Sequence, residues 1–433
     1  LYYSLAWLWS NVFGTGEVAL RSLSVVFGAA VVPVAYFTGA TLVSRATGWI
    51  AAILTATNPL LVWYSTEARA YSLLVLLSAV SLLLLARALT SPTRRTFLLW
   101  SVTTALALAT HYFSVFLIAG EIAVLLAWLP RHRRTVMLAC GPVAITGLLL
   151  APLVYLQRGR GSWIDGYALT KRLEEVGRNF ISGVSIPSLA LEILAAALAS
   201  LLVVIALTGS ARERRVAWAM LAVSAVSLGI PVLVALAGQD YLITRNVIGS
   251  LLPLALVAGV GGASRRFGRV GYLLAASLVA VSLANIALVA TDEQLRRVEW
   301  KDAARLLGVP ERDRLVIAWG EYRLAPFGEL LRPAERVGEA SVVELSQIDI
   351  LRFQRPTGQI SCWSGAACNM VPVASPRHPP APGFSLRERR EDGLFEVYRF
   401  TATEPRRIRV RDVLASLPEA RAAYVWLQAD TSR

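Results

Sequence analysis

Residues 62–71 read VWYSTEARAY and stand between two apolar runs of the chain. The run that follows, residues 72–86, reads SLLVLLSAVSLLLLA and contains no charged side chain. A helix needs about 20 apolar residues to cross the hydrocarbon core of a bilayer, and both runs are typical of such helices. We therefore expect the Glu, the Arg and the two tyrosines between them to lie at a membrane surface, where they need a function.

The composition of the whole chain also indicates a membrane protein. Its 433 residues are 55% hydrophobic and 17% charged, with a mean hydropathy of +0.55, whereas soluble domains are about a quarter charged. Long apolar runs alternate with short polar gaps up to about Thr291, and charge and proline rise beyond that point. We predict an all-α polytopic membrane domain over residues 1–291 and a small extracytoplasmic soluble α/β domain over residues 292–433.

The apolar runs predict ten membrane spans. They cover residues 17–42, 48–63, 69–88, 97–110, 112–129, 135–156, 188–208, 216–237, 245–263 and 271–291. The alternate gaps, at 43–47, 87–96, 130–134, 209–215 and 264–270, carry thirteen Arg and one acid, Glu213. Basic loops remain in the cytoplasm, so these gaps are predicted to be cytoplasmic. One long tilted helix over 97–129 would invert the later loops, so the charge pattern favours two spans there.

This topology places Leu1 and the C-terminal domain on the same outer face. A membrane protein normally starts inside, so we expect at least one further span upstream of Leu1 and read the sequence as a fragment. The predicted location is the plasma membrane, the inner membrane of a bacterium. The net charge of +14 does not indicate a nucleic-acid partner, because topology accounts for the arginines in the gaps.

The outer gaps carry a different set of residues. Three of them place an acid close to an arginine: Glu17 with Arg21, Glu67 with Arg69, and Asp240 with Arg245. Aromatic residues accompany them: Tyr64, Tyr71, Tyr112, Trp163, Tyr167 and Tyr241. For each pair alone, an interfacial contact or a snorkelling arginine is an equally good explanation. The whole set favours a ligand with a phosphate and hydroxyls, since Arg clamps phosphate and carboxylates accept hydroxyls.

The three cysteines give one further prediction. Cys140 lies in an apolar run and is expected to be inert, whereas Cys362 and Cys368 bound the short stretch CWSGAAC. A disulfide between Cys362 and Cys368 suits an oxidising, extracytoplasmic location. The spacing of His and Cys residues gives no zinc site, so no metal ligand is predicted from the residues alone.

Several stretches resemble the polyprenyl-phosphate-sugar-dependent glycosyltransferases of the GT-C superfamily, a group that includes protein mannosyltransferases and the aminoarabinose transferase of lipid A. The resemblance lies in residues 1–89, with the pattern G-x-x-E-x-x-x-R at 14–21 and WYSTEARAY at 63–71, and in THYFSVFLIAG at 110–120. Residues 241–256 and 296–307 resemble the family less specifically. The resemblance implies a GT-C-like helical bundle and leaves the sugar undetermined.

The resemblance also implies a reaction and a site. The enzyme would move a sugar from a polyprenyl-phosphate donor, on the outer face, to an acceptor glycan, lipid or protein of the cell envelope. The principal catalytic acid of the family would precede Leu1 and so be absent here. Glu67 would position the acceptor or contact a divalent metal, Arg69 would bind the donor phosphate, and His111 would either join it or be an interfacial histidine.

The remaining members of the predicted substrate-binding set are Tyr64, Glu17, Arg21, Asp240 and Arg245. Two alternatives stay open. A transporter would need charged groups at mid-membrane, and Glu121, with Glu192 nearer a helix end, is the candidate. A non-catalytic membrane scaffold of the same fold would bind lipid or a partner through its outer domain.

Overall fold

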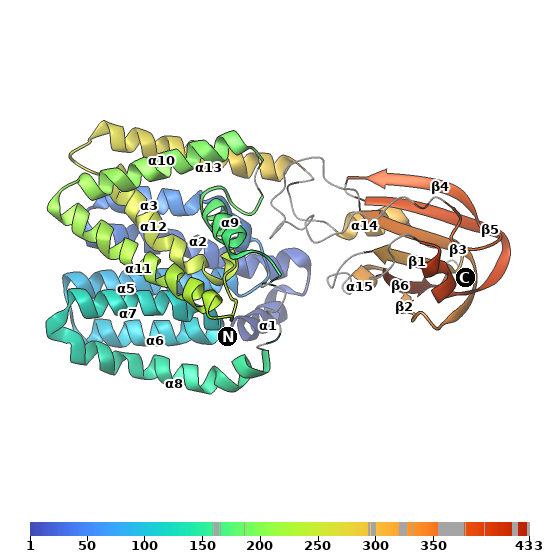
Figure 1. Ribbon diagram of the computed structural model, residues 1–433, viewed down its shortest axis with the longest axis horizontal. Coiled ribbons are helices and arrows are strands. Elements are labelled where there is room, and N and C mark those ends of the chain that lie inside the picture. Colours follow the sequence, from blue (N-terminus) through green and yellow to red (C-terminus); the bar gives the residue numbers. More distant parts are fainter. Residues whose placement is uncertain are drawn as a thin grey trace. The chain divides into compact units, whose positions relative to one another are not determined.

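The structure is a computed structural model that describes most of the chain. The described residues are 1–157, 159, 164, 166–185, 187–292, 295, 300–319, 327–331, 333–353, 376, 378–393, 395–417 and 423–430. Two compact units result: Leu1–Val184 with Ser188–Ala287, and Ser185–Pro187 with Leu288–Arg433. The first is helical and the second is built on a β-sheet (Figure 1). The predicted fold class, a polytopic helical membrane protein with a small C-terminal α/β domain, is confirmed.

The helices follow the apolar runs of the sequence. They are α1 (Tyr2–Phe13), α2 (Glu17–Leu42), α3 (Arg45–Ala56), α4 (Pro59–Ser65), α5 (Tyr71–Thr90), α6 (Arg94–Thr110), η1 (Tyr112–Ser114), α7 (Val115–Trp128), η2 (Pro130–His132), α8 (Arg133–Gln157), α9 (Leu169–Ser182), α10 (Leu189–Thr208), α11 (Ala211–Leu236), η4 (Thr244–Asn246), η5 (Ile248–Ser250), α12 (Leu251–Gly262) and α13 (Arg269–Thr291). Most of the long helices of this unit run side by side (Figure 1).

Six of the described helical segments are long and apolar enough to cross a membrane, or seven if the bent pair α3–α4 counts as one. The six are Glu17–Leu42, Tyr71–Thr90, Pro130–Gln157, Leu189–Thr208, Ala211–Leu236 and Arg269–Thr291. Two of the other predicted spans match the shorter apolar segments Tyr112–Trp128 and Ile248–Gly262, and a third matches α6. The chain is therefore a multi-pass membrane protein by length and composition, and the count of ten spans stays a prediction.

The predicted span over 48–63 is present as two helices with a bend between them, and it counts as one span if the bent pair is taken together. α3 ends at Ala56 and α4 starts at Pro59, with a bend of 60° between them. Proline has no backbone N–H and disfavours helical geometry in the preceding residue, and Asn58 accordingly has φ −68° and ψ 121°. The Asn58 side chain accepts hydrogen bonds from the amides of Leu60 and Leu61 at 3.0 and 3.1 Å. Asn58 and Pro59 thus end one helix and start the next.

The predicted break between two helices within 97–129 is present. α6 ends at Thr110, and His111 is extended, with φ −156° and ψ 112°. The chain then makes the short turn η1 and continues as α7 from Val115. His111 is thereby placed at the junction of two helices.

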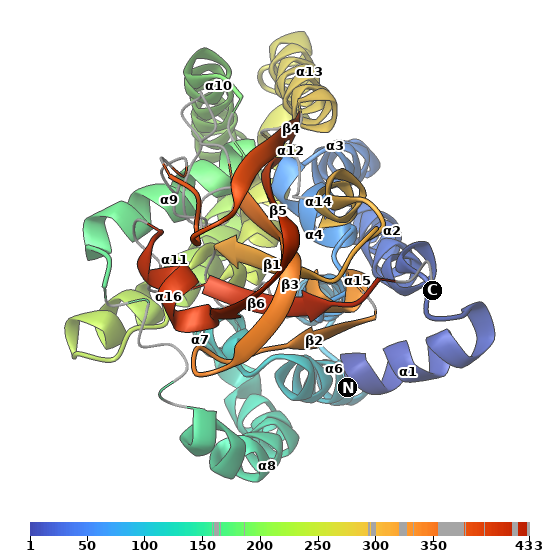
Figure 2. The ribbon, with the colours of Figure 1, turned by 90° about the vertical axis from the view of Figure 1, so that its right-hand side faces the viewer.

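The second unit contains a six-stranded sheet, best seen in Figure 2. Its strands are β1 (Arg314–Trp319), β2 (Ala334–Arg336), β3 (Val342–Phe353), β4 (Ser385–Asp392), β5 (Phe395–Arg409) and β6 (Ala423–Gln428), in the order β2-β6-β1-β3-β5-β4. β1 and β3 are parallel, and the other neighbours are antiparallel. The residues RLVIAW of the sequence form β1.

Apolar residues cover both faces of this sheet. On one face, Leu315 and Ile317 of β1 share a buried cluster with Val413 of α16 (Val410–Ala415). On the other, alternate residues of β1 pack with α14 (Trp300–Leu307) and α15 (Phe327–Leu330). The sheet is therefore the central layer of a small α/β fold, with helices on both sides.

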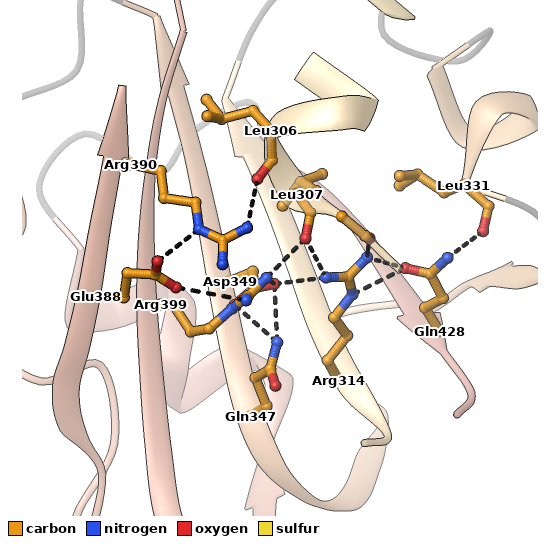
Figure 3. Close-up of polar contacts among 11 residues, drawn as sticks. Leu306, Leu307, Arg314, Leu331, Gln347, Asp349, Glu388, Arg390, Arg399 and Gln428 are labelled. Carbon is orange, nitrogen blue, oxygen red and sulfur yellow. Dashed lines mark hydrogen bonds and ion pairs between the residues drawn. The ribbon is translucent and has the colours of Figure 1, made fainter. Parts of the chain in front are cut away.

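Ionic groups are buried in this sheet, as Figure 3 shows. Arg314 and Asp349, on neighbouring strands, are both 0% exposed, and their side chains pair at 2.9 Å. Arg399 of β5 reaches the same carboxylate at 3.0 Å. Gln428 accepts a hydrogen bond from Arg314 at 2.9 Å, and Gln347 donates to Asp349. Burial lowers the pKa of Arg314 even though Asp349 raises it. One carboxylate therefore balances two guanidinium groups inside the domain.

Candidate functional site

The segment that opened the sequence analysis forms a tight connection between α4 and α5. The amide of Glu67 donates to the carbonyl of Tyr64 at 3.3 Å, and the amide of Arg69 donates to the carbonyl of Glu67 at 2.7 Å. Ser72, in the first turn of α5, donates its hydroxyl to the Tyr64 carbonyl at 2.8 Å. These bonds hold five residues, 66–70, between two helix ends and fix where the side chains point.

Glu67 and Arg69 form an ion pair at the surface of this connection. The distance between Arg69 Nε and Glu67 Oε1 is 3.3 Å, with 24% of the Glu67 side chain and 48% of the Arg69 side chain exposed. Burial lowers the pKa of Arg69, but Glu67 and Tyr71 together raise this pKa by more, so the pKa lies above its ordinary value. Arg69 is therefore a permanent cation that is open enough to meet a ligand.

Aromatic and basic side chains from three further segments surround the pair. The ring of buried Tyr71 lies 4.9 Å from Tyr64 and 5.6 Å from His111. Arg69 hydrogen-bonds Tyr71, and Arg245, just before α12, acts electrostatically on both Tyr71 and His111. The fold thus brings together predicted residues that are up to 181 positions apart, from Tyr64 to Arg245.

His111 contributes a neutral polar group. Burial and, to a smaller extent, the positive charge of Arg245 together lower the pKa of His111 to about 4. Its Nδ1 atom is buried and has no hydrogen-bond partner among the described residues, as is also true of the nearby Ser114 hydroxyl. Such orphaned atoms are rare in folded proteins and mark places where a ligand can bind. At neutral pH, negative charge in this site must be balanced by Arg69 and Arg245.

Asp240 has a partner that the sequence analysis did not consider. It forms an ion pair with Arg172 of α9, whose side chain is only 4% exposed. Arg172 also donates from Nε to the Tyr167 carbonyl at 3.0 Å, and Asp240 accepts from the amide of Leu242 at 3.3 Å. The pair therefore links α9 to the segment that carries Arg245.

More polar contacts fasten α9 to the same region. Asn179 donates to Thr244 at 2.9 Å, and Asn58 donates to the carbonyl of Phe180 at 3.0 Å. Arg178 binds the two carboxylate oxygens of Glu192 at 2.7 and 2.9 Å. The buried polar residues of α9 recur at 172, 175 and 179, which is one helical face. That spacing could have indicated, from the sequence alone, a polar face of α9 that packs against the rest of the protein.

Glu17 and Arg21 form the expected i,i+4 pair in the first turns of α2. Their side chains lie 2.7 Å apart and are 40% and 45% exposed. A pair so open to solvent contributes about 0–1 kcal/mol, which agrees with a helix-surface role. The place of this pair in the site stays a prediction.

An apolar groove begins next to Tyr64. It has a volume of about 210 Å³ and lies among α2, α3, α4 and α5. Its lining includes Val25, Val32, Leu61 and Val75, together with the hydroxyls of Ser65 and Ser72. Tyr64, whose ring contacts Tyr71, is among the lining residues, so the groove adjoins the charged cluster at that residue.

Glu121, the residue on which a transporter would depend, is fully buried in α7. Ser81 of α5 donates to one of its carboxylate oxygens at 2.7 Å, and Trp100 of α6 donates to the other at 2.7 Å. Glu121 thereby joins three helices through hydrogen bonds, which is an interhelical structural role.

We expect Glu121→Gln to lower the melting temperature of the purified protein, because one buried donor loses a carboxylate partner at a cost of about 1–3 kcal/mol. An unchanged melting temperature would contradict this role.

Several expectations fall outside the described residues. Cys362, Cys368 and Trp163 are among the residues that the structure does not describe, so the disulfide stays a prediction. Cys140 is a free cysteine, as expected.

Comparison with known proteins agrees with the resemblance. Residues 1–156 match the family model of dolichyl-phosphate-mannose-protein mannosyltransferases. No curated protein matches the chain significantly. The matched segment runs from α1 almost to the end of α8 and includes Glu67, Arg69 and His111. The chain is thus a multi-pass membrane protein whose first 156 residues are similar to the dolichyl-phosphate-mannose-protein mannosyltransferase family, which is consistent with the GT-C-like superfamily that its motifs resemble.

Proposed function

We propose that the protein transfers a sugar from a polyprenyl-phosphate donor to an extracytoplasmic acceptor. The observation that carries the proposal is the cluster of Glu67, Arg69, Tyr71, His111 and Arg245, next to Tyr64, which also lines an apolar groove. A lipid-linked sugar phosphate combines the two chemistries that this arrangement offers, an anionic head and a long apolar tail.

The residues of the cluster divide the reaction between them. The bond from the sugar C1 to the phosphate oxygen breaks, and a bond from C1 to the acceptor oxygen forms. Arg69 and Arg245 balance the charge of the departing polyprenyl phosphate. Glu67 orients the acceptor hydroxyl and takes up its proton, or contacts a divalent metal that does the same electrostatic work. Neutral His111 donates one hydrogen bond from its N–H group to the phosphate, whose oxygen atoms are acceptors.

The groove beside Tyr64 suits the first isoprene units of the donor. Its volume of about 210 Å³ accommodates only part of a polyprenyl chain, so the remainder would lie along the bundle in the bilayer. The hydroxyls of Ser65 and Ser72 mark the end at which the phosphate would sit. No nucleotide is involved in this scheme, and none of the nucleotide-binding motifs is present in the sequence.

The experiment that tests the function is a donor screen. The purified full-length protein is incubated with a panel of polyprenyl-phosphate sugars and cell-envelope fractions, and sugar transfer is measured. Transfer from at least one donor supports the proposal. If none is used, but the protein binds the donor lipid, the non-catalytic scaffold is the better reading; substrate uptake into vesicles that is abolished by Glu121→Gln would favour the transporter.

We further propose that the basic gaps are cytoplasmic and that the C-terminal unit is outside, in the plasma membrane of a bacterium. Arg131, in the gap before α8, and Asp392, at the end of β4, are both exposed. A membrane-impermeant maleimide applied to intact cells should label Asp392→Cys and spare Arg131→Cys, relative to the parent chain. The reverse pattern would overturn the topology and the placement of the site with it.

A further inference from the structure

Arginines at one end of the helical unit bind the carboxyl ends of helices. Arg212 donates to the carbonyl of Leu42 at 2.8 Å, Arg214 to that of Gly209 at 2.9 Å, and Arg266 to that of Thr208. Carbonyls at helix ends lack partners within the helix and carry partial negative charge. These contacts satisfy the carbonyls and orient the guanidinium groups, and they occur in the gaps where the sequence is most basic.

One of these arginines, Arg212, lines a crevice with a volume of about 180 Å³. It is bounded by the ends of α2, α5 and α7 and by the first turns of α11. Its lining combines Arg212 and Arg215 with Trp128, and with Leu89, Leu129 and Val216. The crevice is therefore basic on one side and apolar on the other.

The positive charge of the crevice is not balanced locally. None of the residues that line it is acidic. Glu213, the nearest acid in the sequence, is 4% exposed and accepts hydrogen bonds from the amide of Ser210, the hydroxyl of Ser264 and the amide of Arg265. The exposed side chain of Arg215 forms no ion pair with any residue that the structure describes. An anion in the crevice would meet two guanidinium groups.

We propose that this crevice binds the phosphate of an anionic membrane phospholipid. Guanidinium groups match phosphate geometry, basic pockets between membrane helices bind anionic headgroups, and tryptophan favours the membrane interface. A lipid fits better than a soluble phosphate, because Leu89, Leu129 and Val216 provide an apolar wall for the glycerol and first acyl carbons.

The proposal is independent of the transferase site. α5 starts with Tyr71 at that site and ends at Thr90, which lines the crevice. A helix of this length spans about 30 Å, so the two sites lie at opposite ends of it. The lipid would stabilise the packing of α2, α5, α7 and α11 without touching the donor.

The test is the melting temperature of the full-length protein in a neutral detergent with added lipid. Dioleoylphosphatidylglycerol should raise the melting temperature by about 3 °C relative to the same amount of dioleoylphosphatidylcholine. The double variant Arg212→Gln/Arg215→Gln should lose this difference. Since each variant is compared with itself in the two lipids, a general loss of stability from the missing Arg212 contact cancels. Arg215→Gln alone removes no hydrogen bond or ion pair among the described residues. It should lose part of the difference in melting temperature between the two lipids.

The control is Arg265→Gln/Arg269→Gln, which removes two exposed positive charges from the same end of the bundle. It should keep the full difference between the lipids. An equal loss in the control would mean a diffuse surface charge rather than a site, and a difference retained by Arg212→Gln/Arg215→Gln would refute the crevice. The same shift with millimolar inorganic phosphate would overturn the assignment to a lipid.

Discussion

Glu67→Gln should lower sugar transfer by about 100-fold or more, the range over which general acid–base groups contribute. The amide keeps the shape of the carboxyl group but cannot take a proton from the acceptor hydroxyl. Because this contribution belongs to the transition state, turnover should fall while binding of the donor lipid changes little. Transfer kinetics and donor-binding isotherms of the full-length protein measure the two effects separately.

Arg69→Lys separates charge from geometry at the same site. Lysine retains the positive charge but loses the planar fork that binds two phosphate oxygens. Hydrogen bonds to charged groups contribute about 1.5–3 kcal/mol, so losing one predicts about a tenfold or greater reduction. Glu174→Gln, in an exposed i,i+4 pair with Arg178 on α9, is the matched control and should transfer normally. If Glu67→Gln and Arg69→Lys also transfer normally, the pair is an interfacial contact and the proposed site is wrong.

Asp349→Asn should destabilise the C-terminal unit by about 3–5 kcal/mol, the effect of removing one partner from a buried ion pair. Asparagine has almost the same volume, so the packing is kept. What changes is charge: Arg314 is 0% exposed, and its only ion pair among the described residues is with Asp349. The substitution leaves a guanidinium group buried without a counter-charge, and Arg399 loses the closer of its two acidic partners.

Hydrogen exchange in the full-length protein measures this loss without isolating the domain. Backbone amides of β1 and β3 should exchange at least about 100-fold faster in the variant. Asp392→Asn removes one negative charge from the exposed end of β4 and should leave the exchange unchanged. Protection of β1 and β3 that survives Asp349→Asn would mean that backbone pairing and apolar packing suffice for the sheet.

The features that the sequence predicted well are those carried by neighbouring residues. Apolar runs located most of the long helices, and the charge pattern of the loops favoured two helices within residues 97–129, which are α6 and α7. The Glu17–Arg21 pair follows from the helical spacing alone. The bend at Asn58 and Pro59 was not predicted although both residues were visible, because hydropathy registers the apolar character of a run and does not register a change of direction.

The features that the sequence did not predict depend on contacts between distant segments. Arg172 and Asp240 are 68 residues apart, and nothing near either residue indicates the other. The same holds for Arg314, Asp349 and Arg399, because the sequence around each of these residues does not indicate the other two. Such pairings are set by how strands and helices pack, and a single sequence carries no direct record of that packing.

The groove beside Tyr64 has a consequence for how the reaction should be quantified. If the groove binds the proposed donor, its apolar lining means that the donor would reach it by lateral diffusion within the bilayer and not through water. Encounter is then a two-dimensional search, and the concentration that governs saturation is the mole fraction of donor among the surrounding lipids. Adding neutral detergent at constant total donor lowers the mole fraction of donor and would slow the reaction. Michaelis constants expressed in molar units would then vary with the amount of detergent, although the protein itself is unchanged.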